Sequence, residues 1–213
     1  MYSKRIDKIV SKIPQCDILA DIGCDHGYIG VSALRQNIAK KCLFSDISAP
    51  SLNKAKLLCQ KLGLENRADF FVGDGTQKID YADCVVIAGM GGRETIDILQ
   101  NCKFAPKYFV LQPMKNLYEV REYVAKNYHI LYDKITFDKK FYNLIVLEQG
   151  QDNLDEMQKY FGKTNLLQKH DDFVNYVRCE IAKTQKLLNK KPDNQKMVDK
   201  LALLTSVEKE LEK

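Results

Sequence analysis

The stretch 17–30, which reads DILADIGCDHGYIG, constrains the fold more than any other part of the chain. It begins with a short apolar run, and glycines follow at positions 23, 27 and 30. An apolar run that ends in glycines is typical of a buried strand followed by a tight turn. Residues 28–38 then have apolar side chains at helical spacing, so the glycines lie where a strand passes into a helix. Such a junction presents free N–H groups to an anionic ligand.

The glycine spacing differs from the dinucleotide-binding fingerprint G-x-G-x-x-G, which argues against a nicotinamide-dependent oxidoreductase. Here an acidic residue precedes a wider pattern, Asp21-x-Gly23-x-x-x-Gly27-x-x-Gly30. This pattern resembles motif I of the Rossmann-like methyltransferases that use S-adenosylmethionine (SAM), whose loop surrounds the methionine half of the cofactor. A glycine-rich turn in an ordinary α/β protein is the alternative, and motifs further along the chain are needed to distinguish the two.

Two further strand ends carry carboxylates suited to the same cofactor. The run 42–46 ends in Asp46, which lies 19 residues after Gly27, where a Rossmann-type fold binds ribose hydroxyls. A cap for the next helix is the alternative role of Asp46. The run 68–72 is followed by Asp74 between two glycines, which alone indicates only a turn. In SAM methyltransferases a carboxylate at this point accepts a hydrogen bond from the adenine amino group.

The run 83–88 is continuously apolar, which is typical of a central parallel strand buried on both faces. It ends in GMGG at 89–92, and the carboxyl ends of such strands carry the ligand site. Many methyltransferases that act on exocyclic amines have an Asp/Asn-Pro-Pro-aromatic motif here. The chain lacks that motif, which points to another acceptor.

The rest of the strand pattern predicts how the sheet ends. A strand at 108–111 and a helix at 116–126 precede two long strand-like runs, 129–137 and 141–149, which a short polar link joins. Five βα units followed by a hairpin predict an α/β protein. We expect a Rossmann-like SAM-methyltransferase fold with a seven-stranded, mostly parallel sheet whose reversed edge strand is inserted between two others.

After Gly150 only helical patterns remain. Two apolar stripes, within 154–190 and 195–212, are joined by a turn at 190–194. They predict an antiparallel helical hairpin that resembles a coiled coil and either packs on the sheet domain or clamps a partner. We therefore divide the chain into a SAM-dependent methyltransferase domain at 1–151 and a C-terminal α-helical hairpin domain at 152–213.

Composition narrows the class further. No apolar run approaches the roughly 18–20 residues of a membrane span, and the N-terminus has no apolar core of a signal peptide, so we expect a cytoplasmic protein without a membrane partner. Seven cysteines without a C-x-x-C pair and three scattered histidines argue against a metal site or disulfide framework. The net charge of +5 points only weakly to nucleic acid. We expect a monomer.

The combined motifs ADIGCDHGYIG, Asp46, GDG at 73–75, IAGMGG at 87–92 and LQP at 111–113, with the helical C-terminus, resemble one family. It is that of the bacterial TrmK-type tRNA (adenine-22-N1)-methyltransferases. The resemblance implies an enzyme that transfers a methyl group from SAM to adenine N1 in the D-loop region of tRNA. It also implies these cofactor-binding residues: Asp21, Gly23, Cys24, Gly27, Asp46, Ile47, Asp74, Gly75, Ala88, Gly89, Met90 and Gly91.

Adenine N1 has an in-plane lone pair, so methyl transfer to it needs positioning more than a strong base. Groups that stabilise the cationic product or take a proton from the amino group are the candidate catalytic residues. They are Asp25, His26, Tyr28 and Gly89, for which organising the loop or packing is the alternative role. The candidates for tRNA phosphate contacts are Lys4, Arg5, Lys8, Lys115 and Arg121, each with a solvated face as the alternative.

Two other functions share these motifs. A SAM-dependent methyltransferase acting on another RNA base or on a small molecule would keep the cofactor residues. A small-molecule enzyme should also carry a lid over its substrate. A non-catalytic tRNA- or protein-binding module on the same fold is disfavoured because Asp21, Gly23, Asp46 and Asp74 are all present.

Overall fold

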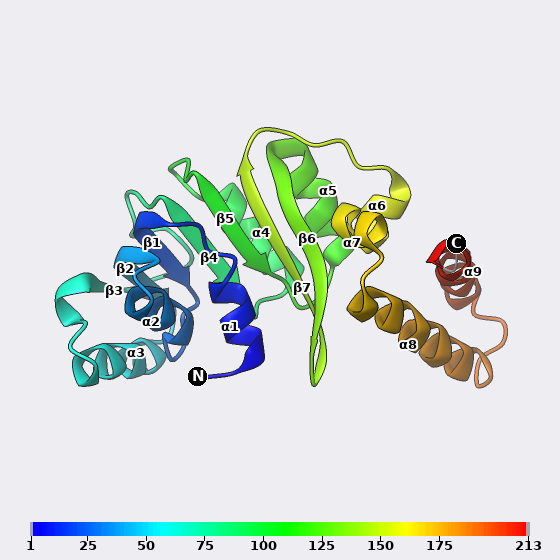
Figure 1. Ribbon diagram of the computed structural model, residues 1–213, viewed down its shortest axis with the longest axis horizontal. Helices are drawn as coiled ribbons and strands as arrows, with labels where there is room; N and C mark the ends of the chain where they lie inside the picture. Colours follow the sequence, from blue (N-terminus) through cyan, green and yellow to red (C-terminus); the bar gives the residue numbers. More distant parts are fainter. Residues whose placement is uncertain (1, 212–213) are drawn as a thin grey trace.

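The computed structural model describes residues 2–211 and is built around one sheet of seven strands (Figure 1). The strands are β1 (Cys16–Ile22), β2 (Ala39–Asp46), β3 (Ala68–Val72), β4 (Cys84–Ala88), β5 (Tyr108–Gln112), β6 (Tyr128–Asp138) and β7 (Lys140–Gln149). The helices are α1 (Lys4–Val10), α2 (Tyr28–Arg35), α3 (Ala49–Lys61), α4 (Gly92–Gln100), α5 (Leu117–Asn127), α6 (Glu156–Phe161), α7 (Lys163–Gln168), α8 (Asp171–Leu188) and α9 (Gln195–Leu211).

The order of the strands across the sheet is β3-β2-β1-β4-β5-β7-β6. The first five strands pair in parallel, whereas β7 is antiparallel to both of its neighbours, β5 and β6. The predicted fold class is therefore confirmed, including the reversed strand inserted near the edge. All five parallel strands end at one edge of the sheet, and that edge is where a ligand site is expected.

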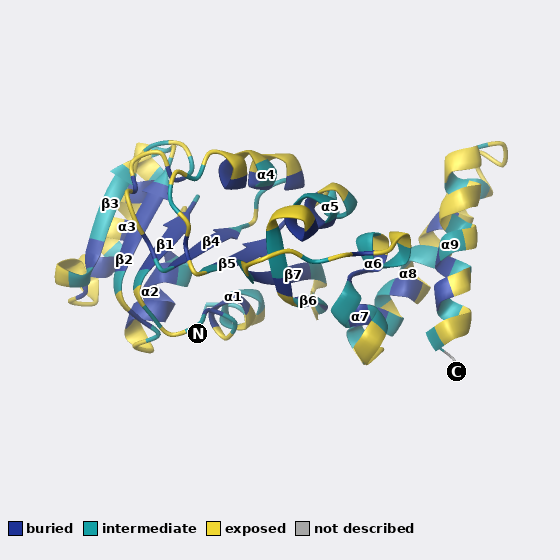
Figure 2. Cartoon of the chain, turned by 90° about the horizontal axis from the view of Figure 1, so that it is seen from above, coloured by how far each residue is buried: buried dark blue, intermediate teal, exposed yellow. Residues whose placement is uncertain are grey.

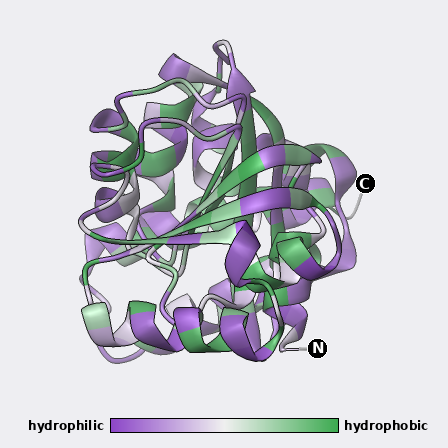
Figure 3. Ribbon diagram, turned by 90° about the vertical axis from the view of Figure 1, so that its left-hand side faces the viewer, coloured by the Kyte–Doolittle hydropathy of each residue, from purple (hydrophilic) through white to green (hydrophobic). Residues whose placement is uncertain are grey.

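Helices cover both faces of the sheet, which explains why the central strands are apolar throughout. One apolar cluster joins α1, α2 and α3 to one face, and a second joins α4 and α5 to the other. Figure 2 shows α4 and α5 on the side of the sheet opposite α1 and α2. The hydropathy colours of Figure 3 place the apolar residues in this interior and hydrophilic stretches on the outer helix surfaces. The last four residues of β1 and the first four of β4 are consequently buried.

The helical stretch predicted within 154–190 is interrupted twice. Gly162 has φ +87° and ends α6, and Lys169 has φ +43° and ends α7. A Cβ at Gly162 would lie 2.6 Å from the Asp133 carboxylate, so only glycine fits where the chain crosses β6. The predicted antiparallel hairpin is present as α8 and α9, which ion pairs from Glu180 to Lys200 and from Arg178 to Glu208 connect.

The C-terminal helices pack directly on the sheet along its edge strand, β6. Backbone N–H groups of Asp133, Ile135 and Phe137 donate hydrogen bonds to side chains of Thr164 (3.0 Å), Asn165 (2.9 Å) and Asp172 (3.2 Å), respectively. Beside them, a third apolar cluster joins Ile135 to five buried side chains of the helices: Phe161, Phe173, Val177, Leu204 and Val207. The helices thus occupy hydrogen-bonding groups that an edge strand leaves free.

Candidate active site

The glycine-rich loop connects β1 to α2 at the ligand edge of the sheet. Gly23 and Gly27 have positive φ angles of +63° and +70°, which side chains rarely adopt. A Cβ at Gly30 would lie 2.4 Å from the Phe44 ring, so this glycine lets α2 approach β2 closely. The helix that follows therefore begins next to the ends of β1 and β2.

Asp21 is buried under this loop, with 2% of its surface exposed. Its carboxylate accepts a hydrogen bond of 2.9 Å from the Gly30 N–H. Burial raises the pKa of Asp21 to about 7, the Gly30 hydrogen bond opposes the rise, and the charge of Asp46 adds to it. The end of β1 thus holds a carboxyl group that exchanges its proton near neutral pH.

Asp46, at the end of β2, holds the loop in place. One carboxylate oxygen accepts a hydrogen bond from the Asp25 N–H (2.9 Å) and the other from the Ser48 N–H (2.8 Å). Ser48 itself caps α3, because its Oγ accepts a hydrogen bond from the Ser51 N–H. The cap therefore belongs to Ser48, and Asp46 fixes Asp25 in an unusual left-handed conformation with φ +46°.

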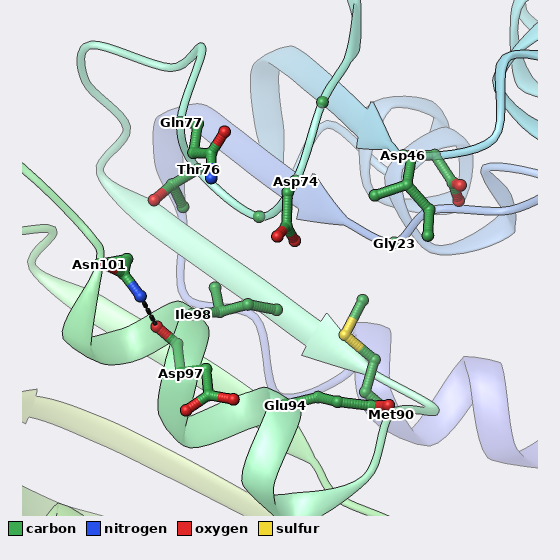
Figure 4. Close-up of a pocket in the computed structure, with 13 residues that line it drawn as sticks. Gly23, Asp46, Asp74, Thr76, Gln77, Met90, Glu94, Asp97, Ile98 and Asn101 are labelled. Atoms are coloured by element: carbon green, nitrogen blue, oxygen red, sulfur yellow. Dashed lines mark hydrogen bonds between the residues drawn. The ribbon is translucent and has the colours of Figure 1, made fainter.

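A cleft of about 440 Å³ opens outside the carboxyl ends of β1, β2, β3 and β4 (Figure 4). Of the residues predicted to bind a cofactor, it is lined by Gly23, Asp46, Ile47, Asp74, Gly75 and Met90. Residues of α4, among them Glu94 and Asp97, border it as well. It also contains Thr76, whose buried Oγ1 has no hydrogen-bond partner among residues 2–211.

A second pocket of about 280 Å³ adjoins the first. The two share Gly23 and Met90, and a Cβ at Gly23 would lie 2.0 Å from the Met90 methyl group. Figure 4 shows the Met90 side chain extending toward Gly23. Seven more of the predicted cofactor-binding and catalytic residues line the second pocket: Asp21, Cys24, Asp25, His26, Tyr28, Ala88 and Gly89.

The second pocket contains an oriented imidazole. His26 Nδ1 lies 2.6 Å from an Asp25 carboxylate oxygen, while Nε2 forms no hydrogen bond with any described residue. The His26 ring stacks on Tyr28, with centroids 5.2 Å apart, and Tyr28 also stacks on Tyr2 at 4.3 Å. The structure therefore brings the candidate catalytic side chains together, with Tyr28 engaged by two other rings.

Arg5 reaches this pocket from α1. Its Nε donates a 2.6 Å hydrogen bond to the side-chain oxygen of the buried Gln112, and a Cβ at Gly89 would lie 3.1 Å from its guanidinium. Burial lowers the pKa of Arg5. Gln112 was not among the predicted residues, although its position in the LQP motif at the end of β5 was a usable signal.

Other predicted residues lie outside the pockets. Gly27 and Gly91 line neither one: Gly27 packs against Ala55, and the Gly91 N–H donates to Glu94 at the start of α4. The exposed Lys4, Lys8 and Lys115 remain accessible at the surface.

The prediction that Arg121 contacts RNA is wrong. Its side chain is 1% exposed and forms an ion pair of 2.7 Å with the fully buried Asp133. It also donates to Asn143 and to the carbonyl oxygens of Lys159 and Tyr160. Every branch of the guanidinium is thus used inside the protein.

Residues 2–211 contain neither a cluster of metal-ligating side chains nor a helix that could span a membrane. Three or more His, Cys, Asp or Glu side chains do not gather anywhere in this range in a way that would hold a metal ion. None of the helices in the same range combines the length and the apolar character needed to cross a membrane.

The sheet is covered by helices on both faces, β7 is inserted between β5 and β6, and two carboxylates hold the glycine-rich loop. This is the architecture of the SAM-dependent methyltransferases. Comparison with known proteins agrees. Residues 2–145 match the family described as "Methyltransferase domain". The tRNA (adenine(22)-N(1))-methyltransferase of Bacillus subtilis (strain 168) is 32% identical over 155 residues, which cover 70% of this chain and 65% of that protein, just under two thirds.

Solved structures extend the similarity over the full chain. TrmK of M. capricolum in complex with S-adenosyl-homocysteine is 25% identical with a TM-score of 0.87, covering 100% of this chain and 98% of that one. Streptococcus pneumoniae Sp1610 in complex with SAM is also 25% identical, with a TM-score of 0.88 and coverage of 98% and 100%. The chain belongs to the methyltransferase domain family and, within it, to the TrmK-type branch.

Proposed function

We propose that this protein is an enzyme that transfers a methyl group from SAM to N1 of adenine 22 in tRNA. The observation that carries the proposal is the pair of adjoining pockets that share Gly23 and Met90. A cofactor in the larger cleft would present its sulfonium end to the smaller pocket. The name of the B. subtilis relative supports the choice of substrate and acceptor atom.

The residues of the larger cleft fit SAM, which supplies an electrophilic methyl group when bound. Asp46 retains free lone pairs that would bind the ribose hydroxyls, and Asp74, which lines the same cleft, would accept a hydrogen bond from the adenine amino group. Gly75 has φ +53° and packs near Ile98, so its backbone can lie close to a flat ring. The unpartnered Thr76 Oγ1 gives this end of the cleft a spare hydrogen-bonding group.

The smaller pocket suits a single flipped base. Taking a base out of its stack costs a few kcal/mol, which contacts in the pocket must offset. The acceptor ring becomes cationic as the new bond to N1 forms. The Nε2 atom of His26, oriented by Asp25, would accept a hydrogen bond or proton from the amino group, and the Gly89 carbonyl would stabilise the positive charge.

Transfer of labelled methyl groups from SAM to unmodified tRNA, with the product nucleosides resolved, tests the proposal. The expected product is N1-methyladenosine, lost when adenine 22 is replaced and strongly reduced in an Asp46→Ala variant. Methylation of another base would contradict the proposed acceptor and favour a different RNA methyltransferase. SAM binding without transfer to RNA would favour a small-molecule acceptor, and tRNA binding without SAM binding would favour a non-catalytic module.

We also propose that the chain acts as a cytoplasmic monomer without a metal ion, and that residues 1–151 and 152–213 are its two domains. Sedimentation velocity should give a mass near the 24.5 kDa of one chain, and activity should survive EDTA. A dimer mass would contradict the monomer, and loss of activity in EDTA would contradict the absence of a metal ion.

A further inference from the structure

The β6–β7 hairpin extends beyond the rest of the sheet at the ligand edge. β7 pairs with β5 only from Ile145 to Glu148, whereas its pairing with β6 continues to the tip at 138–140. Because β7 is antiparallel to β5, its free beginning lies at the edge where the parallel strands end. Five strand residues at about 3.3 Å each make the extension roughly 16 Å long. Figure 1 shows it projecting past the sheet close to α1.

Contacts with α1 and α8 hold this extension in place. The Arg5 N–H at the start of α1 donates a 2.9 Å hydrogen bond to the Asp138 carboxylate at the hairpin tip. The Arg5 guanidinium lies 5.4 Å from the centre of the Tyr142 ring. On the opposite face of the extension, Phe141 packs on Tyr176 of α8. Arg5 thus connects the extension to the smaller pocket, which it also lines.

Lysines gather on the side of the extension that faces α1. The Lys12 ammonium lies 4.4 Å from the centre of the Tyr132 ring. Burial lowers the pKa of Lys12, and the like charges of Lys8 and Lys134 lower it further. Lys134 and Lys8 also lie near His170, which precedes α8. Burial lowers the pKa of His170, and the charge of Lys134 lowers it further, while Asp172 and Asp171 oppose the change. The positive charges of α1 and β6 are therefore close together.

These lysines lack acidic partners. Lys8, Lys12, Lys134, Lys139 and Lys140 form no ion pair with any residue from 2 to 211, whereas Lys183 and Lys200 of the helical hairpin both pair with Glu180. Asp138 at the tip already accepts the Arg5 hydrogen bond, and the nearby Asp172 accepts one from the Phe137 N–H. Uncompensated like charges lower the stability of the folded chain, and a polyanion would relieve their repulsion.

We propose that this α1–hairpin face, made of Lys8, Lys12, Lys134, Lys139 and Lys140, binds the phosphate backbone of the RNA substrate and directs it to the smaller pocket. The inference rests on the proposed tRNA substrate and adds the surface on which the RNA lies. Phosphate contacts of this kind give affinity without sequence preference.

Two double charge reversals, Lys8→Glu with Lys134→Glu and Lys139→Glu with Lys140→Glu, test the face at its centre and tip. The matched control is Lys61→Glu with Lys103→Glu, two exposed lysines without ion pairs at the opposite edge of the sheet. We expect each test variant to bind tRNA about tenfold more weakly and to lower the salt dependence of binding by about one unit of slope per lysine. SAM affinity should stay within about twofold, and the product should remain N1-methyladenosine.

The outcomes separate the inference from the proposed function. If wild-type protein methylates tRNA but both test variants match the control in tRNA affinity and salt slope, the RNA lies elsewhere and the inference is wrong. If wild-type protein binds SAM and neither binds nor methylates tRNA, the proposed function fails and the inference falls with it. Circular dichroism checks folding, and the tip variant decides alone if the central variant unfolds, because Lys139 and Lys140 are exposed and outside the core.

Discussion

At the scale of single residues, Asp21 shows how the fold changes ordinary chemistry. Its carboxyl group is buried beneath the loop, and burial raises its pKa to about 7 against a usual value near 4. The folded chain therefore binds a proton at Asp21 between about pH 4 and pH 7 that the unfolded chain releases. Stability from this group is complete below about pH 4 and falls as the pH rises toward 7.

An Asp21→Asn variant should lose this pH dependence. At pH 8, without cofactor, we expect it to be more stable than wild type by about 1–3 kcal/mol, because the amide needs no buried charge. It should also bind SAM more weakly at pH 8, since the cationic amino group of the cofactor loses a nearby carboxylate. Denaturant unfolding from pH 4 to 8 and calorimetric titration measure the two effects. Parallel stability profiles for variant and wild type would contradict the assignment.

Asp25 offers a test of the oriented imidazole. Its φ of +46° suits asparagine, so Asp25→Asn should keep the loop and the bond from its N–H to Asp46. The variant loses only the negative charge beside His26 Nδ1. We expect kcat to fall about 10–100-fold with SAM affinity unchanged, in line with the loss of a group that orients another. An unchanged kcat would assign Asp25 a purely structural role.

At the scale of elements, the burial of Arg121 is an example of a feature that the sequence alone could not predict. The strands and the glycine-rich loop could be predicted from apolar runs and glycines, because these patterns depend on residues close together in the sequence. Arg121 lies on α5 among exposed charged residues, and only the pairing of β6 with β7 brings Asp133 and Asn143 beside it. The helix breaks at Gly162 and Lys169 also depend on distant residues, because they let α7 contact the edge strand β6.

Breaking this pair should therefore lower stability and leave RNA binding alone. Arg121→Met leaves the buried Asp133 carboxylate without its partner, which we expect to cost about 3–5 kcal/mol. Adding Asp133→Leu should restore much of that loss, because two apolar side chains replace two charges. Urea unfolding of both variants measures the difference. A stable Arg121→Met protein with weakened tRNA affinity would instead indicate that Arg121 contacts the RNA.

At the scale of the whole molecule, the C-terminal helices complete the sheet as much as they extend it. Asn165 is fully buried and bridges the two parts: its Oδ1 accepts from the Ile135 N–H, and its Nδ2 donates to the Phe161 carbonyl. The apolar cluster beneath it takes Ile135 from the sheet and the remaining buried side chains from the helices. The sequence left open whether the helices pack on the sheet domain or clamp a partner, and the structure shows the packing. The residues of the shared core could not be identified from the sequence, because the core depends on contacts between distant residues.

A chain that ends at Gly150 should consequently be unstable. It would expose Ile135 and the free N–H groups of β6, and exposed edges of this kind pair with other chains. We expect a lower melting temperature and concentration-dependent self-association in light scattering after size exclusion. The full-length Asn165→Ala variant, which removes one bridge, should lose about 1–3 kcal/mol and stay monomeric. A truncated chain that remains monomeric, melts like the full-length protein and binds SAM would show that the sheet domain folds on its own, with the helices serving only the substrate.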